Sequence, residues 1–193
     1  MTRILLVFLL LSALPAAAHD PEGSDARPSM EVSVEAAPGR LPDADVVDQF
    51  GNHLRFREAV GDGAYVLGFT YTNCTSLCGM ADLWLSHFAE RRGEIDGPVR
   101  LVTLTLDPAR DRPADLLRRH RELGSHEGWL RLTGRPSEII PLLTRLGAWD
   151  GRPIEEHKLV ILVGNAGEEV VTRLEPDPML PERLFALASA YAR

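Results

Sequence analysis

Two cysteines separated by three residues, Cys74 and Cys78, are the only cysteines of the chain. Their thiolates could serve either disulfide exchange or the binding of a soft metal ion. A disulfide between them would close so short a loop that it would remove little entropy from the unfolded chain, and it would therefore reinforce a domain poorly. The spacing favours chemistry over reinforcement, although a structural disulfide stays open as an alternative.

The cysteine pair lies where a strand is expected to lead into a helix. Residues 64–71 form an apolar and aromatic run typical of a buried strand, and residues 80–90 carry apolar side chains at helical spacing. The N-terminus of a helix lowers the pKa of a nearby thiol, because its N–H groups are unpaired and its dipole is positive there. We therefore expect thiolate character at Cys78 and, if it lies near enough, at Cys74.

The remaining chain alternates between predicted strands and helices. Strands are expected at 64–71, 99–106, 129–133, 158–163 and 169–174, a hairpin at 45–56 with its turn at Gly51-Asn52, and helices at 80–90, 113–123, 137–147 (capped by Ser137) and 181–192. Central strands separated by helices, followed by a closing hairpin and helix, describe an α/β fold with a central mixed sheet flanked by helices. We expect a single thioredoxin-like domain at 41–193.

The N-terminal residues are interpreted as an export signal. Arg3 precedes an apolar run at 4–14, and Ala16-Ala17-Ala18 form a small-residue site suited to a signal peptidase, so the signal peptide is assigned to 1–18. Residues 19–40 are rich in Pro, Asp, Glu, Gly and Ala and are predicted to be a flexible lead-in. We expect a periplasmic protein. An uncleaved N-terminal membrane anchor is the alternative, although the apolar run is shorter than the roughly 20 residues of a membrane span.

The bulk composition narrows the class of function. The chain has 193 residues, of which 45% are hydrophobic and 25% charged, as in an ordinary soluble domain. Its formal net charge is -7, whereas binding to nucleic acid requires a basic surface. The composition therefore argues against a nucleic-acid partner.

Three segments carry a family resemblance when they are taken together. Residues 69–78 read Phe-Thr-Tyr-Thr-Asn-Cys-Thr-Ser-Leu-Cys, residues 106–111 read Leu-Asp-Pro-Ala-Arg-Asp, and residues 156–167 contain Glu-His-Lys, an apolar strand and Asn-Ala-Gly. In order and separation they resemble the F-x-Y-T-x-C-x-x-x-C, D-P-x-R-D and D-H-x segments of the Sco/SenC family of copper chaperones. The resemblance runs from about Asp45 to the C-terminus.

The resemblance implies one copper ion bound by Cys74, Cys78 and His157. Thiolates select Cu(I), and an imidazole suits both Cu(I) and Cu(II). It also implies a role in assembling the copper centre of cytochrome c oxidase, with the copper-centre subunit or another periplasmic copper protein as the partner. Such a chaperone is not an enzyme, although its dithiol could also reduce a disulfide in the recipient.

Two other functions stay open at this point. A periplasmic thiol–disulfide oxidoreductase would use Cys74 and Cys78 and would not need His157, although thioredoxin-type enzymes more often have two residues between their cysteines. A sensing or structural domain would bind copper and deliver none. A structural zinc site is disfavoured, because it usually has four protein ligands and the chain has no third cysteine.

Two aspartates of the second segment are further candidates. Asp107 ends a central strand, where the functional loops of α/β sheets gather, and it could orient His157, tune the thiolates or serve structure alone. Asp111 precedes a predicted helix, and N-capping is its expected role. The remaining candidates are expected to be ordinary surface histidines (His53, His87, His120, His126) or core residues (Met80, Trp84, Trp129, Trp149).

Overall fold

The computed structural model describes residues 41–74, 77–176 and 180–193, without the side chains of Leu77 and Cys78. The predicted signal peptide and lead-in at 1–40 therefore lie outside the described residues, as does the centre of the cysteine loop at 75–76. Within the described ranges, no helix is long and apolar enough to cross a membrane.

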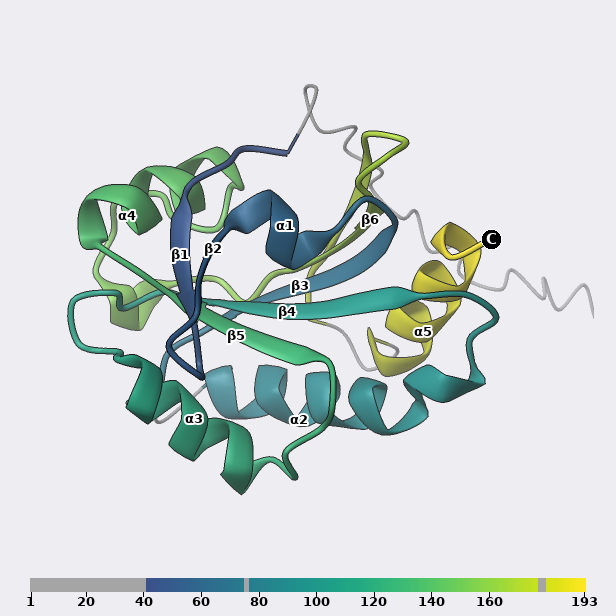
Figure 1. Ribbon diagram of the computed structural model, residues 1–193, viewed down its shortest axis with the longest axis horizontal. Coiled ribbons are helices and arrows are strands. Elements are labelled where there is room, and N and C mark those ends of the chain that lie inside the picture. The colour runs from purple at the N-terminus through teal and green to yellow at the C-terminus, as the bar shows by residue number, and fades with distance from the viewer. Residues whose placement is uncertain (1–40, 75–76, 177–179) are drawn as a thin grey trace, which may run out of the picture. The chain divides into compact units, whose positions relative to one another are not determined.

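One mixed sheet of seven strands, in the order β2-β1-β5-β4-β3-β6-β7, forms the centre of the described chain (Figure 1). The strands are β1 (Asp45–Asp48), β2 (His53–Arg55), β3 (Ala64–Thr70), β4 (Val99–Thr105), β5 (Trp129–Thr133), β6 (Ile161–Asn165) and β7 (Val170–Leu174). β3, β4 and β5 are parallel to one another, and every other neighbouring pair is antiparallel. The predicted single α/β domain with a central mixed sheet is confirmed.

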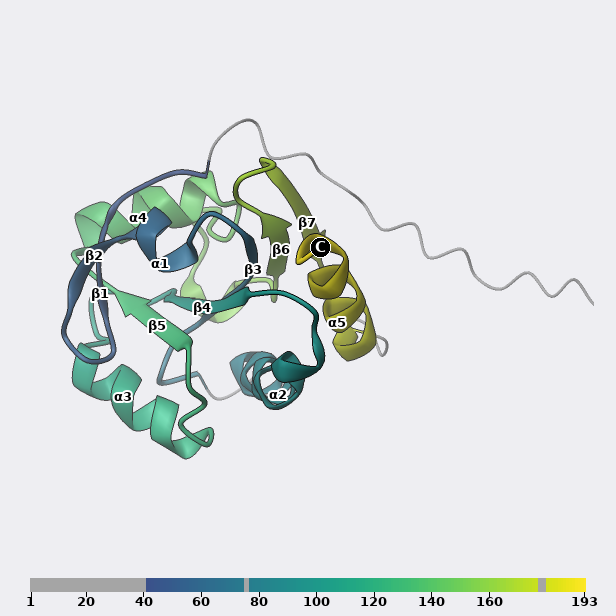
Figure 2. The ribbon, with the colours of Figure 1, turned by 45° about the vertical axis from the view of Figure 1, so that its right-hand side comes forward.

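Helices cover both faces of this sheet (Figures 1 and 2). They are α1 (Phe56–Val60), α2 (Leu77–Arg91), α3 (Pro113–Glu122), α4 (Pro136–Arg145) and α5 (Leu180–Tyr191), with short 3₁₀ turns η1 (Arg92–Glu94) and η2 (Ile154–Glu156). Strand β3 is buried along its whole length and divides the core in two. Its Leu67 and Phe69 belong to the cluster under α1 and α4, whereas Val66 belongs to the cluster under α2 and α5. This alternation follows from the two-residue period of a strand.

Several predicted details differ from the structure. Ser137 does not cap α4, because the helix begins at Pro136 and Arg135 is its N-cap residue, an arrangement that uses the fixed φ of proline at the first position. Strand β6 begins at Ile161 rather than Lys158. Met80 is not a core residue, since 42% of it is exposed. Trp129 is buried as expected, and Trp84 and Trp149 pack against the core while staying partly exposed.

Candidate metal centre

The cysteine segment begins at the carboxyl end of β3. Because β3 and β4 are parallel neighbours, with Thr70 opposite Thr105, the segments that follow them leave the sheet at the same edge. Beyond β3 the chain turns at once, and the Cys74 N–H donates to the Tyr71 carbonyl oxygen at 3.3 Å. Cys74 is half-buried, and Cys78 occupies the first turn of α2, with its side chain outside the described part of the chain. The predicted strand-to-helix junction is confirmed.

Asp111 holds this segment in place and is not the N-cap of α3. Its buried carboxylate accepts hydrogen bonds from the Thr72 N–H at 3.1 Å, from the Thr72 hydroxyl, and from the Thr105 hydroxyl at 2.5 Å. The N-cap of α3 is Arg112, whose N–H donates to Asp115 at 3.2 Å. The prediction of N-capping was therefore wrong, because the Asp111 side chain turns back into the protein toward the end of β3.

His157 reaches the same edge of the sheet from β6. Strand β6 is antiparallel to β3, with Ile161 opposite Gly68, so the chain that precedes β6 lies beside the end of β3. His157 follows η2 and is buried, and its ring meets that of Tyr71 edge to face, with ring centroids 5.6 Å apart. Tyr71 thus contacts Cys74 through its backbone and His157 through its ring.

The orientation of the His157 ring suits a metal ligand. Its Nδ1 lies 2.6 Å from the carbonyl oxygen of Ile154, and a carbonyl oxygen can only accept, so Nδ1 carries the hydrogen. In the neutral ring the lone pair is then on Nε2, the nitrogen that is able to bind a metal ion. A backbone acceptor on the opposite nitrogen is a common support for metal-binding histidines.

Asp107 is tied to its own loop. Its backbone N–H donates to the Thr105 hydroxyl at 3.0 Å, and its carboxylate lies 3.3 Å from the Arg110 guanidinium. These contacts provide a structural role for Asp107. Its proposed action on His157 stays a prediction.

Two of the three predicted copper ligands, Cys74 and His157, have described side chains. Among the described side chains, no three His, Cys, Asp or Glu residues form a group that could hold a metal ion. The Cys78 side chain lies outside that set, so the ligation of one ion by Cys74, Cys78 and His157 stays a prediction. What the structure shows is Tyr71 in contact with both residues, through its carbonyl oxygen with the Cys74 N–H and through its ring with His157.

A second group of histidines lies on α3 and the loop that follows it. His120 is buried, which contradicts its prediction as a surface residue, and its ring contacts those of Phe50 and Trp129. The sequence signal was its i, i+4 spacing from the buried Leu116, which places both on the inner face of α3. His126 is half-buried rather than fully exposed, and its ring stacks on Trp129. His53 and the His87 side chain are exposed, as expected.

The fold and this edge of the sheet define a thioredoxin-like α/β domain with a cysteine turn held beside a buried histidine. The sequence model of the SCO1/SenC family matches residues 42–172. The chain therefore belongs to the SCO1/SenC family. No curated protein matches the sequence.

Solved structures with the same fold include copper-bound proteins. ScoI of Bradyrhizobium japonicum with copper bound is 20% identical, with a TM-score of 0.66 over 79% of this chain and 99% of that one. Yeast Sco1 with copper bound is 19% identical, with a TM-score of 0.61 over 80% of this chain and 91% of that one. BsSco, a member of the Sco family of cytochrome c oxidase assembly proteins, is 19% identical, with a TM-score of 0.66 over 82% of this chain and 97% of that one.

Proposed function

We propose that the protein is an exported copper chaperone that binds one copper ion through Cys74, Cys78 and His157 and passes it to the copper centre of cytochrome c oxidase. The observation that carries the proposal is the position of Tyr71, whose carbonyl oxygen accepts from Cys74 and whose ring packs against His157. The proposal is supported by membership of the SCO1/SenC family and by the copper bound in structural relatives. It is also supported by BsSco, a member of a family of cytochrome c oxidase assembly proteins.

The donor set suits copper as a cargo that must be released. Two thiolates and one imidazole nitrogen can hold Cu(I) at low coordination number, which leaves one side of the ion open to a ligand of the recipient. The hydrogen bond from His157 Nδ1 to Ile154 presents Nε2 for binding, and the half-buried Cys74 is within reach of an incoming protein. Export through residues 1–18, with an uncleaved anchor as the alternative, belongs to the same proposal.

An anaerobic Cu(I) competition titration of the reduced chain from His19 onward tests the ligand set. We expect one tightly bound copper in the parent protein and weaker binding in Cys74→Ser, Cys78→Ser and His157→Ala. His87→Ala is the matched control, because the side chain of this histidine on α2 is 52% exposed. Copper binding that survives His157→Ala unchanged would reject the three-ligand site.

A thiol–disulfide oxidoreductase is the second candidate, and it too can use the position of Cys78 in the first turn of α2. A helix N-terminus stabilises a thiolate whatever its use. This function predicts that reduction of a test disulfide, such as glutathione disulfide, requires both cysteines and proceeds normally in His157→Ala. The chaperone proposal predicts that the same variant loses copper.

A further inference from the structure

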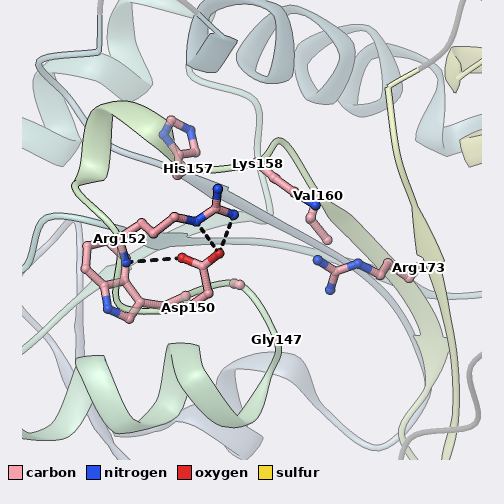
Figure 3. Close-up of a pocket in the computed structure, with 9 residues that line it drawn as sticks. Gly147, Asp150, Arg152, His157, Lys158, Val160 and Arg173 are labelled. Atoms are coloured by element: carbon pink, nitrogen blue, oxygen red, sulfur yellow. Dashed lines mark hydrogen bonds and ion pairs between the residues drawn. The ribbon is translucent and has the colours of Figure 1, made fainter.

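An open pocket adjoins His157 on the side formed by the turn after α4, the residues that lead into β6, and the end of β7 (Figure 3). Three cationic side chains line it, those of Arg152, Lys158 and Arg173. A protein that covers this pocket would contact both His157 and these charges.

The three cations are not equivalent. Arg152 is neutralised by Asp150, with Nε and Nη2 at 2.7 and 2.5 Å from one carboxylate oxygen, and this pairing raises the pKa of the guanidinium. Glu156 adds a further negative charge near it. Within the described part of the chain, neither Lys158 nor Arg173 has a hydrogen bond or an ion pair, so two positive charges in the pocket that His157 also lines have no partner. The chain as a whole carries -7.

The fold fixes the position of Arg173. It lies on β7 opposite Leu162, between the buried residues Thr172 and Leu174, and it is itself half-buried. Its guanidinium lies against the turn at Gly147, where a Cβ would be only 3.1 Å from Nη1. Gly147 also has a φ of +67°, which favours glycine. A cation held in this way loses less entropy on binding than a freely rotating surface arginine.

We propose that Arg173, together with Lys158, binds a carboxylate of the protein that receives the copper and so orients that protein against His157. This inference rests on the proposed chaperone function. A guanidinium is well suited to bind a carboxylate, because its planar fork of N–H groups donates two parallel hydrogen bonds to the two carboxylate oxygens. The negative charge of the whole chain repels an acidic partner, so a local positive site directs its approach to this face.

The experiment uses the chain from His19 onward and the reduced, copper-free soluble domain of the oxidase copper-centre subunit. Copper transfer is followed by stopped flow, and association of the two copper-free proteins by NMR titration, each at low and high ionic strength. The variants are Arg173→Gln, Arg173→Glu and Lys158→Gln. Arg121→Gln, an exposed arginine on α3, makes the same charge change away from the pocket.

At low ionic strength we expect transfer and association to weaken roughly threefold in Arg173→Gln and about tenfold in Arg173→Glu. Lys158→Gln should show a smaller loss, Arg121→Gln none, and high salt should remove the differences. Copper affinity should stay at the parental value in every variant.

The two proposals fail in different ways. Parental behaviour of both Arg173 variants, or an equal loss in Arg121→Gln, would overturn the carboxylate contact while leaving the chaperone intact. Association that depends on Arg173 without any copper transfer would support the contact and reject delivery. Absence of both association and copper transfer in the parent protein would overturn both.

Discussion

The carboxylate of Asp111 accepts hydrogen bonds from the backbone N–H and the hydroxyl of Thr72, a residue 39 positions away in the sequence. Through this contact the loop after β4 holds the chain between β3 and Cys74. The Thr105 hydroxyl occupies the remaining side of the same carboxylate at 2.5 Å. The position of Cys74 therefore depends on a buried residue that acts as a support for the cysteine turn.

We expect Asp111→Asn to lower both stability and copper affinity. An amide nitrogen in place of one carboxylate oxygen would face a hydrogen-bond donor, so one buried donor would lose its acceptor at a cost of about 1–3 kcal/mol. Chemical denaturation and Cu(I) titration measure the two effects. Asp115→Asn, at a partly exposed carboxylate on α3, is the control and should keep the parental copper affinity. Parental copper affinity in Asp111→Asn would show that the turn is held by other contacts.

Tyr71→Leu should weaken copper binding without unfolding the domain. The substitution removes the edge-to-face contact with the His157 ring, an interaction worth about 0.5–1.5 kcal/mol, and retains an apolar side chain. The expected loss in Cu(I) affinity is roughly twofold to tenfold. Phe50→Leu removes an exposed aromatic ring elsewhere and should leave the affinity unchanged. Equal affinities for Tyr71→Leu and the parent would mean that Tyr71 does not position His157.

The positions of the strands could be predicted from the sequence where the local signals for strands and turns are strong. Strand β3 is buried at all seven positions, so its run of apolar and aromatic residues has one interpretation, and the Gly51-Asn52 turn sets the hairpin of β1 and β2. The predicted start of β6 at Lys158 was wrong, because the residues from Lys158 onward have strand-like composition but join the sheet only at Ile161.

The sequence could not predict contacts that depend on the tertiary fold. Asp111 stands before a helix, and local rules favour capping there. Only the parallel packing of β3 against β4 brings Thr72 to it. Likewise, the contact between Tyr71 and His157 joins the residue after β3 to one that precedes β6, and the pairing of these two strands is not encoded in their spacing.

Stability should fall as the pH is lowered through the range in which His120 titrates. Burial, the first cause, and the nearby Arg131 and His126 hold the pKa of His120 below its ordinary value of 6.5. Near pH 6.5 the unfolded chain therefore binds a proton that the folded chain does not, and folding is opposed increasingly until the folded pKa is passed. Above about pH 7.5 the histidine contributes no pH dependence.

The substitution His120→Phe isolates this contribution. It keeps a ring against Phe50 and Trp129 and removes the titrating group. Denaturant unfolding between about pH 5 and 8 should show a smaller loss of stability in the variant on the acid side. Curves that stay parallel for the two proteins would contradict a role for His120. His53→Phe, at an exposed position, should leave the pH dependence unchanged.

Asp82→Asn should be the most destabilising of these substitutions. Asp82 on α2 is 2% exposed and lies 3.1 Å from Arg131 and 2.8 Å from Arg119, so it joins α2 to β5 and α3. Removing its charge leaves the buried Arg131 uncompensated, which costs about 3–5 kcal/mol. Asp115→Asn, in a more exposed pair with Arg118, should cost far less.

The double variant Asp82→Leu/Arg131→Met separates a buried charge from lost packing. Because it removes both charges together, it should be more stable than Asp82→Asn, although it gives up the stacking of Arg131 on the Trp129 ring at 4.2 Å. Denaturant unfolding of the three proteins measures this difference. A double variant less stable than Asp82→Asn would show that the ion pair itself, rather than the avoidance of an unpaired arginine, stabilises the junction of α2 with the sheet. Asp82 lies one helical turn after Cys78, so the same comparison repeated with Cu(I) titration reveals whether that junction also supports copper binding.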